Sequence, residues 1–450
     1  MFSKLLIANR GEIASRIIRT CKKMGITAVA VYSAADQEAP FVKQADEAYF
    51  LGGSKPQDSY NHIEKIVTIA KLAHCEAIHP GYGFLSENAL FAKRCAAEGV
   101  VFIGPPAACI ELMGRKIEAR QMMEAAGLPV VPGISFPLQN VEEAVIQAKK
   151  IGYPIMLKAS AGGGGIGMGA IRNEKELVEA FDGHQNRARL FFNNSEMFIE
   201  KLLHNPRHIE IQVLADSYGN VVHLWDRECS IQRRNQKIIE EAPSTFLTDE
   251  QRRAMGAAAV EATKAIGYVN AGTLEFMVDE QGHYYFLEMN TRIQVEHPIT
   301  EEITKLDIVE QQIRISAGEK LCFSQEEVPL IGHAIEARIY AEDPVSFFPS
   351  PGMITVWNIP QGDNIRHDVG VEELSKISPF YDGMLAKLIV TGVNRESCME
   401  LMRGVLDLYK VGGIKTNITM LQQIIAHEQF RKGNTTTSFV EKYYLNREGS

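Results

Sequence analysis

The sequence has few cysteines, and they form no recognisable site. Its seven cysteines are odd in number and scattered, and none belongs to a Cys-x-x-Cys pair. This pattern excludes a disulfide framework and a zinc site of the usual spacing. It favours a reducing, cytoplasmic location.

Long apolar runs are missing as well. Nowhere do eighteen apolar residues follow one another, and the N-terminal run 5–8 is too short for a signal peptide. With 47 basic and 56 acidic residues, the net charge of −9 argues against a general binder of nucleic acid or anionic membranes. We therefore expect a soluble protein in which any anionic ligand needs a local basic site.

The first 110 or so of the 450 residues have the pattern of an open, largely parallel α/β sheet. A buried strand over 4–8 is followed by a helix with apolar residues at helical spacing and by a second strand over 27–32. The first turn between strand and helix, Asn9-Arg-Gly-Glu12, lacks the Gly-x-Gly-x-x-Gly that a dinucleotide requires there.

The rest of the chain divides into a short module and a long strand-rich part. The module runs to about residue 203 and has the order helix, strand, glycines, strand, helix. Alternating strands follow over 208–215, 221–225, 272–278, 283–290 and 333–340, and a final α+β stretch contains a strand over 384–391 and a helix near 397–409.

Six glycines lie within the eight positions 162–169. Strands over 154–159 and 170–172 flank them, so we predict that they connect a hairpin and do not open a helix. A Walker loop is excluded because the chain has no Gly-Lys dipeptide. We expect a flexible flap whose backbone N–H groups close over a polyphosphate, with Lys158 at its base. A mobile loop without a ligand is the alternative.

The stretch from Glu288 to Glu296 predicts a metal site. At period two, Glu288, Asn290, Arg292, Gln294 and Glu296 share one side of an extended strand. Residues 272–278 pair with residues 283–288 around the turn 279–282, which brings Glu275 to the same face, diagonally across the ladder. Hard oxygen ligands favour Mg²⁺ completed by nucleotide phosphates. An exposed hairpin with acidic decoration is the alternative.

Two basic groups accompany this face in an acidic protein. Gln232, Arg233, Arg234 and Lys237 lie close together in one stretch, while Glu336, Arg338 and Tyr340 alternate on one strand. A surface loop and a charged edge strand would explain them without a ligand. Beside a metal face and a glycine flap, they indicate clamps for phosphate or carboxylate.

Together these motifs resemble the biotin carboxylase family of ATP-grasp enzymes, in order and from about Leu5 to Phe439. The segments that carry the resemblance are Arg10-Gly-Glu-Ile-Ala, His79-Pro-Gly-Tyr-Gly-Phe-Leu-Ser-Glu-Asn88, Lys158 with the glycine flap, Arg207-His-Ile-Glu-Ile-Gln212, Gln232-Arg-Arg-Asn-Gln-Lys237 and Glu288-Met-Asn-Thr-Arg-Ile-Gln-Val-Glu-His297. The resemblance implies an α/β and α+β multidomain fold. It divides the chain into an N-terminal open parallel α/β domain (1–129), an ATP-grasp lid with the glycine flap (130–203), and an ATP-grasp body with a C-terminal α+β biotin carboxylase domain (204–450).

The resemblance also implies the roles of individual residues. ATP would lie between lid and body, with Mg²⁺, or Mn²⁺, on Glu275, Glu288 and Asn290. The expected ATP-binding residues are Lys116, Lys158, Gly163, Gly164, Gly165, Glu200, Lys201, Leu203, His208, Gln232 and Asn235. Bicarbonate would lie against Lys237, Arg292, Gln294 and the backbone of Val295. Glu296 would be the base, Arg338 would stabilise the biotin enolate, and Tyr82 would pack on the biotin ring.

The implied reaction is the carboxylation of biotin by bicarbonate through carboxyphosphate, driven by MgATP. It is the first half-reaction of a biotin-dependent carboxylase, which we expect to be acetyl-CoA carboxylase in fatty acid synthesis. Because the chain has no Met-Lys-Met biotinylation site, the biotin carboxyl carrier protein and the carboxyltransferase are expected on separate chains, with this chain as a homodimer. The alternatives are another ATP-grasp carboxylase or ligase and a non-catalytic nucleotide-binding subunit.

The flap departs from the family pattern. Family members usually carry a Lys or Arg directly after the four glycines and often another shortly after, where this chain has Ile166 and Gly169. We predict weaker charge attraction between the lid and the triphosphate. A milder departure is Asn235, where His is frequent.

Overall fold

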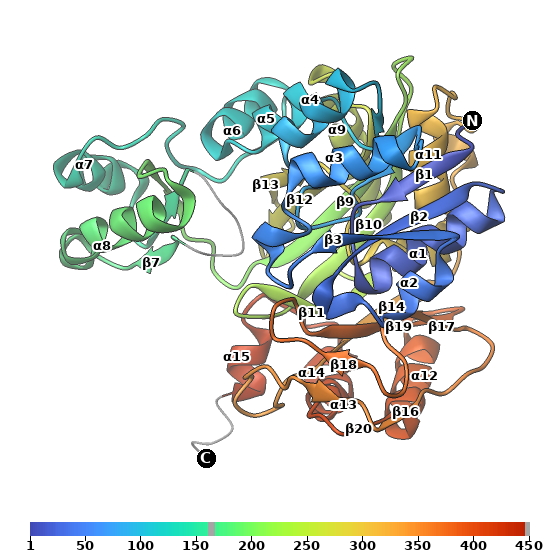
Figure 1. Ribbon diagram of the computed structural model, residues 1–450. Coiled ribbons are helices and arrows are strands. Elements are labelled where there is room, and N and C mark those ends of the chain that lie inside the picture. Colours follow the sequence, from blue (N-terminus) through green and yellow to red (C-terminus); the bar gives the residue numbers. More distant parts are fainter. Residues whose placement is uncertain (161–166, 446–450) are drawn as a thin grey trace.

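The computed structural model describes residues 1–160 and 167–445. The N-terminal part is a five-stranded parallel sheet of order β3-β2-β1-β4-β5 (Figure 1). Its strands are β1 (Lys4–Ile7), β2 (Thr27–Ser33), β3 (Glu47–Gly52), β4 (Ala77–His79) and β5 (Val101–Phe102). The predicted parallel α/β sheet is confirmed.

Helices cover both faces of this sheet, because successive side chains of a strand point to opposite sides. Leu5 and Ile7 of β1 pack in one cluster with residues of α1, whereas Leu6 packs in another with residues of α3 and α4. The helices of this part are α1 (Gly11–Lys23), α2 (Pro40–Gln44), α3 (Ile63–Leu72), α4 (Ala89–Ala97), α5 (Ala107–Met113) and α6 (Lys116–Ala125).

A small unit stands apart from the rest of the molecule (Figure 1) and is called the lid below. It is a three-stranded antiparallel sheet of order β7-β6-β8 with two helices, α7 and α8, packed together. Its elements are α7 (Val141–Ile151), β6 (Ile155–Ala159), β7 (Gly169–Ile171), α8 (Glu174–Phe192) and β8 (Met197–Lys201). The predicted hairpin around the glycines is confirmed, since β6 pairs antiparallel with β7.

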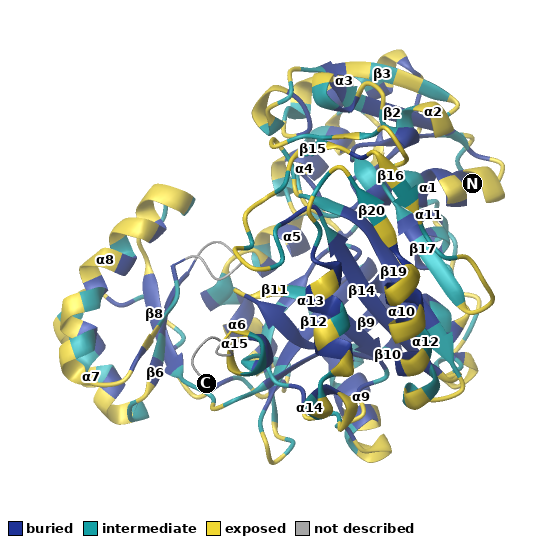
Figure 2. Ribbon diagram, turned by 90° about the horizontal axis from the view of Figure 1, so that it is seen from below, coloured by how far each residue is buried: buried dark blue, intermediate teal, exposed yellow. Residues whose placement is uncertain are grey.

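An eight-stranded antiparallel sheet joins the remaining parts of the chain, in the order β13-β12-β9-β10-β11-β14-β19-β17. Its centre is buried on both sides (Figure 2). The strands are β9 (Arg207–Ala215), β10 (Val221–Arg233), β11 (Gln236–Ala242), β12 (Asn270–Val278), β13 (Tyr284–Asn290), β14 (His333–Tyr340), β17 (Ile365–Val369) and β19 (Met384–Gly392).

Helices pack on this sheet and short strand pairs complete the C-terminal part. The longest of these helices, α9, begins with a capping box of Thr248 and Gln251, a local signal that stops the chain from continuing as strand. The helices are α9 (Asp249–Ala265), α10 (His297–Thr304), α11 (Ile308–Ser316), α12 (Arg395–Leu408), α13 (Ile418–Ala426), α14 (Glu428–Arg431) and α15 (Phe439–Tyr443). The short pairs are β15 (Gly352–Met353) with β18 (Lys376–Ile377), and β16 (Val356–Asn358) with β20 (Lys410–Gly412).

One expectation about a strand needs correction. The strand predicted over 221–225 continues as β10 to Arg233 and pairs with β11, so the basic stretch is a hairpin and not a surface loop. Arg234 and Asn235 have positive φ angles of 50° and 64°, as the two residues of a tight hairpin turn require.

Within the described part of the chain, no helix is both long and apolar enough to cross a membrane.

Candidate active site

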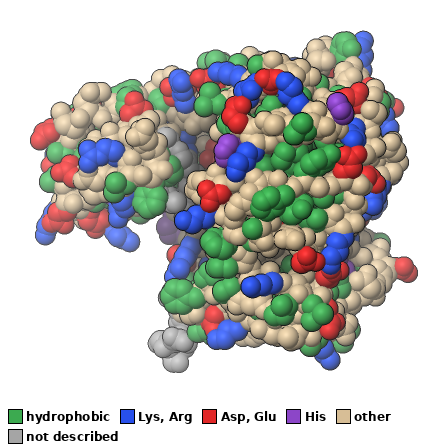
Figure 3. Space-filling view, viewed as in Figure 1, with side chains coloured by type: hydrophobic (Ala, Val, Ile, Leu, Met, Phe, Trp, Pro, Cys, Tyr) green, Lys and Arg blue, Asp and Glu red, His purple; other side chains and the backbone are tan. Residues whose placement is uncertain are grey.

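A cavity of about 900 Å³ lies between the lid and the large sheet. In the space-filling view a recess separates the lid from the rest of the molecule (Figure 3). Eighteen of the predicted site residues are described, and all of them line this cavity: Tyr82, Lys116, Lys158, Glu200, Lys201, Leu203, His208, Gln232, Asn235, Lys237, Glu275, Glu288, Asn290, Arg292, Gln294, Val295, Glu296 and Arg338. The flap residues Gly163, Gly164 and Gly165 lie outside the described residues.

Glu275 and Glu288 face each other directly across β12 and β13. The diagonal arrangement predicted from a symmetric hairpin is wrong, because the register shifts between Glu275 and Phe276. Phe276 pairs with Phe286 and Glu275 with Glu288, so an extra residue of β13 bulges at Leu287. The bulge places the two carboxylates at the close distance of opposite residues.

This carboxylate pair has the donors of a Mg²⁺ site. The Glu288 carboxylate accepts no hydrogen bond from any side chain in the described part of the chain, and its burial together with the charge of Glu275 raises its pKa. Asn290 contributes an amide, whose Nδ2 donates to Glu275 Oε1 at 2.8 Å. A hard divalent cation between these oxygens would relieve the repulsion.

Lys237 of β11 projects its ammonium group into a cluster of three carboxylates. Its Nζ donates to Glu210 Oε2 at 2.6 Å, to Glu275 Oε1 at 2.8 Å and to Glu296 Oε1 at 2.6 Å. Burial alone would raise the pKa of Glu275, but the charges of Lys237 and His208 outweigh it, and the pKa is lowered.

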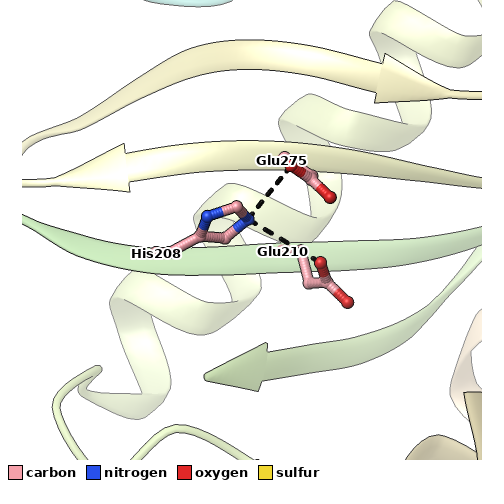
Figure 4. A group of neighbouring side chains, drawn as sticks. All are labelled: His208, Glu210 and Glu275. Carbon is pink, nitrogen blue, oxygen red and sulfur yellow. Dashed lines mark ion pairs between the residues drawn. The ribbon is translucent and has the colours of Figure 1, made fainter. Parts of the chain in front are cut away.

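His208, Glu210 and Glu275 come close enough together to hold a metal ion. Figure 4 shows the imidazole pointing toward both carboxylates, with Nε2 at 3.1 Å from Glu275 and 3.9 Å from Glu210. The Lys237 ammonium already binds an oxygen of each carboxylate. We therefore interpret this group as part of an ion-pair cluster.

Glu296 is completely buried and lies between two cations. Besides Lys237, it accepts a hydrogen bond of 2.9 Å from Nη2 of Arg338 on β14. Burial works to raise the pKa of Glu296, but Lys237, Arg338 and Arg227 together lower it well below its usual range. The carboxylate is thus ionised at neutral pH, which is the form that accepts a proton.

The extended strand predicted through Glu296 ends at Asn290, and α10 begins at His297. The prediction of one continuous strand face is therefore wrong. The turn still brings the same polar groups together: Arg292 donates to Asn290 Oδ1 at 2.9 Å and to Gln294 Oε1 at 3.1 Å. Gln294 in turn donates to Glu275 Oε1 at 3.1 Å.

Two lysines and a buried acid of the lid line the cavity, and Lys116 of α6 lines it as well. Lys158 of β6 forms an ion pair with Glu200 of β8, and Arg120 of α6 binds the other oxygen of Glu200 at 2.7 Å. Burial lowers the pKa of Lys116, and the charge of Glu288 opposes this. Lys201 donates to the backbone oxygens of Gly152 at 2.8 Å and Tyr153 at 3.2 Å, so its ammonium group is held within the lid.

Three family models match the chain in succession. They are the biotin carboxylase N-terminal domain over residues 1–110, the ATP-binding domain of the carbamoyl-phosphate synthase L chain over 115–323, and the biotin carboxylase C-terminal domain over 336–442. Biotin carboxylase 2 of Bacillus subtilis is 56% identical over 443 residues, which cover 98% of this chain and 100% of that protein. The chain belongs to the biotin carboxylase family.

Solved structures agree with this assignment. The Campylobacter jejuni biotin carboxylase in complex with β,γ-ATP matches with a TM-score of 0.97 and 44% identity, over 98% of this chain and 99% of that one. The biotin carboxylase domain dimer of Hydrogenobacter thermophilus 2-oxoglutarate carboxylase, solved with MgADP, ADP and bicarbonate, matches with a TM-score of 0.96 and 51% identity, over 98% and 97%. The predicted family, the multidomain fold and the class of ATP-dependent ligase are confirmed. The expected ATP, Mg²⁺, bicarbonate and biotin agree with this family.

Several residues in contact with the site had no role in the sequence-based prediction, among them Arg120, Glu210, Glu87 and Glu12. Arg120 binds Glu200, Glu210 binds Lys237, Glu87 accepts from Arg292 Nε at 2.9 Å, and Glu12 accepts the Tyr82 hydroxyl hydrogen bond. The period-two alternation of His208, Glu210 and Gln212 could have indicated Glu210. The others depend on long-range contacts that no local pattern reveals.

The structure gives a reason for one of the two flap departures. A Cβ atom added at Gly169 of β7 would lie 2.5 Å from the ring of His184, which comes from α8. The imidazole thus fills the space that a side chain at this position would need. Ile166 lies outside the described residues.

Proposed function

We propose that this chain carboxylates carrier-linked biotin with bicarbonate and MgATP, as the first half-reaction of a biotin-dependent carboxylase. The observation that carries the proposal is the position of Glu296. It is buried between Lys237 and Arg338, on the wall of the cavity that also contains the Glu275 and Glu288 pair. A base, two cations and a metal-binding face would allow one anion, bicarbonate, to attack another, the triphosphate of ATP.

The proposed first step is a proton transfer to Glu296. Bicarbonate lies against Lys237, Arg292, Gln294 and the backbone of Val295, and a Glu296 oxygen takes its proton. The resulting carbonate oxygen attacks the γ-phosphorus, the bond to the β-phosphate oxygen breaks, and carboxyphosphate and ADP form. Lys237 stabilises the anion that develops while Glu296 becomes neutral.

The nucleotide and the metal are proposed to bind at other residues of the same cavity. Lys116, Lys158, His208, Gln232 and Asn235 would contact ATP, together with Glu200, Lys201, Leu203 and the flap glycines 163–165. Mg²⁺ on Glu275, Glu288 and Asn290 would neutralise phosphate oxygens when bound, in keeping with the hard oxygen donors present there.

The second part of the reaction requires a cation beside biotin. Carboxyphosphate breaks down to CO₂ and phosphate, phosphate takes the ureido proton, and the biotin enolate forms next to Arg338. The ureido nitrogen of biotin then attacks the carbon of CO₂, which gives carboxybiotin. Arg338 is buried, and its guanidinium is paired with Glu240 and Glu296. Once Glu296 is protonated, it no longer neutralises the Arg338 guanidinium, whose positive charge can then stabilise the enolate. Tyr82 would pack on the biotin ring.

We further propose acetyl-CoA as the final acceptor, in fatty acid synthesis. Two relatives named simply biotin carboxylase share 56% and 55% identity with this chain and a third shares 49%, compared with 51% for a pyruvate carboxylase subunit of Methanothermobacter thermautotrophicus. The test supplies cognate carriers and transferases and measures malonyl-CoA, oxaloacetate and oxalosuccinate. Formation of oxaloacetate or oxalosuccinate in place of malonyl-CoA would show that the acceptor is an oxo acid and not acetyl-CoA.

The carrier and transferase are proposed as separate chains, with this chain as a homodimer in the cytoplasm. This chain spans 100%, 99% and 99% of three relatives named biotin carboxylase, and the Hydrogenobacter neighbour is a dimer. All seven cysteines are free thiols, which fits a reducing compartment.

The decisive experiment measures phosphate release from MgATP, with and without bicarbonate and biotin. We expect release that depends on both, and its loss in Glu296→Gln and Arg338→Ala by roughly 100-fold or more. Glu241→Gln is the matched control, because Glu241 is equally buried but binds His333 and Arg395 outside the cavity. ATP binding without such turnover would instead support a non-catalytic nucleotide-binding subunit.

A further inference from the structure

Lys387 of β19 is a completely buried lysine behind the cavity wall that the proposed reaction does not use. Its Nζ donates to the backbone oxygen of Val295 at 2.9 Å. The same ammonium lies 3.1 Å from Glu12 Oε2 and 3.8 Å from Asp368 Oδ2. A buried ammonium can be retained only where it is paired and hydrogen-bonded in this way, so its position is well defined.

Lys387 stands directly opposite Arg338 in the pairing of β14 with β19. Paired residues point to the same face of a sheet, so the two cations lie side by side. They hold successive residues of the turn before α10: Arg338 binds the Glu296 side chain at 2.9 Å, and Lys387 binds the Val295 carbonyl. The sheet therefore holds both the side chain of Glu296 and the peptide group that precedes this residue.

The other partners of Lys387 connect this turn to the N-terminal part. Glu12 lies in the first turn of α1 and accepts a hydrogen bond from the hydroxyl of Tyr82. Burial raises the pKa of Glu12, and the charge of Lys387 opposes this shift. Asp368 is held in turn by Arg366 at 2.9 Å and Arg19 at 2.7 Å.

A continuous chain of contacts thus runs from Tyr82 through Glu12 and Lys387 to Val295. Glu12, Tyr82 and Val295 line the same cavity, whereas Lys387 does not. Lys387 cannot touch bicarbonate through this arrangement, but it fixes the orientation of the peptide after Val295, which carries Glu296.

We infer that Lys387 is a positioning residue that holds the bicarbonate-binding turn in place and ties it to the biotin side of the cavity. The inference rests on the proposed function, since it assigns the turn 294–296 to bicarbonate. The residues proposed for ATP are other residues of the cavity, so loss of Lys387 is expected to affect bicarbonate and leave ATP recognition intact.

The test compares Lys387→Met with Arg252→Met in the full chain, using phosphate release with free biotin. Arg252 is a matched control because it is a buried cation, paired with Asp226 at 2.6 Å, whose partners do not line the cavity. We expect the bicarbonate KM of Lys387→Met to rise by about 10- to 100-fold, as the loss of a hydrogen bond to a charged group predicts, with an unchanged ATP KM. Arg252→Met is expected to lower thermal stability without separating the two KM values.

If Lys387→Met and Arg252→Met change the two KM values alike, the positioning role is refuted and Lys387 only stabilises the fold. If Lys387→Met does not fold, Glu12→Gln replaces it, because it removes the carboxylate that anchors the ammonium and keeps the side-chain size. Its bicarbonate and biotin KM values are expected to rise while the ATP KM stays constant, and an unchanged bicarbonate KM would overturn the inference. Absence of bicarbonate-dependent turnover in the unmutated protein would refute the proposed function instead.

Discussion

Replacement of Lys237 by methionine is expected to destabilise the folded protein in a pH-dependent way. The change keeps most of the side-chain volume but removes the charge that three carboxylates share at 2.6 to 2.8 Å. Glu210 and Glu296 are completely buried, and Glu275 nearly so. Without the ammonium group, like charges face one another in a water-poor environment.

Removing one partner of a buried ion cluster costs about 3–5 kcal/mol. The Lys237 side chain is 12% exposed to solvent, so we expect a cost at the lower end of this range. About 3 kcal/mol lowers the melting temperature by roughly 3 °C when all 450 residues unfold together, since the entropy of unfolding is about 2 cal/mol/K per residue.

The sign of the pH dependence follows from the carboxylates. In the unmutated protein the pKa values of Glu275 and Glu296 are lowered, so their contribution to stability is complete above the unfolded pKa of about 4.5 and is constant from pH 5 to 8. In Lys237→Met, burial raises these pKa values with less opposition, and the folded state gains stability as pH falls through them. The loss of stability is therefore largest at pH 8 and smaller at pH 5.

Differential scanning calorimetry at pH 8 and pH 5 measures both effects. Lys201→Met is the matched control. Among the described residues, Lys201 donates only to backbone oxygens, so its loss leaves none of their carboxylates without its cation. We expect the same melting shift for this control at the two pH values. A pH-independent shift for Lys237→Met, or one below about 1 °C at pH 8, would refute the ion-cluster interpretation.

Three further predictions concern the flap and the carboxylate cluster. Ile166→Lys adds a cation after the glycines and is expected to lower the ATP KM; an unchanged KM and turnover would show that the missing charge does not matter. Gly169→Ala places a Cβ atom 2.5 Å from the His184 ring and is expected to lower lid stability by about 1–3 kcal/mol, measured by hydrogen exchange of β6 and β7, whereas unchanged exchange would mean that His184 moves freely. Glu210→Gln weakens the contacts to Lys237 and Arg227 and is expected to reduce kcat by about 10-fold or more, so kinetics like those of the unmutated protein would argue against a role in positioning Lys237.

The positions of strands and helices could be predicted well where the pattern was local. The β-α-β unit at the N-terminus and the hairpin around the glycines both follow from apolar periodicity. The register of β12 with β13 could not, because a bulge at Leu287 leaves almost no trace in an alternating sequence. The same bulge decides whether Glu275 and Glu288 face each other or lie on a diagonal.

The end of β13 at Asn290 was also beyond prediction. Residues 288–296 alternate as a strand would, yet the chain turns and starts α10. Tertiary contacts hold this turn: Glu87 accepts from Arg292, and Lys387 binds Val295, from parts of the chain far away in sequence. Local propensity is a weak prior, and such contacts override it.

By itself, the sequence determined the family, the order of the elements and most of the polar residues that line the cavity, because motifs and periodicities are written along the chain. Only the tertiary structure decided which charges meet. Glu296 lies between Lys237 and Arg338, and Lys387 joins Glu12 to Val295, since these strands and helices pack together. Electrostatic interactions depend on distance and on burial, and both are properties of the folded chain.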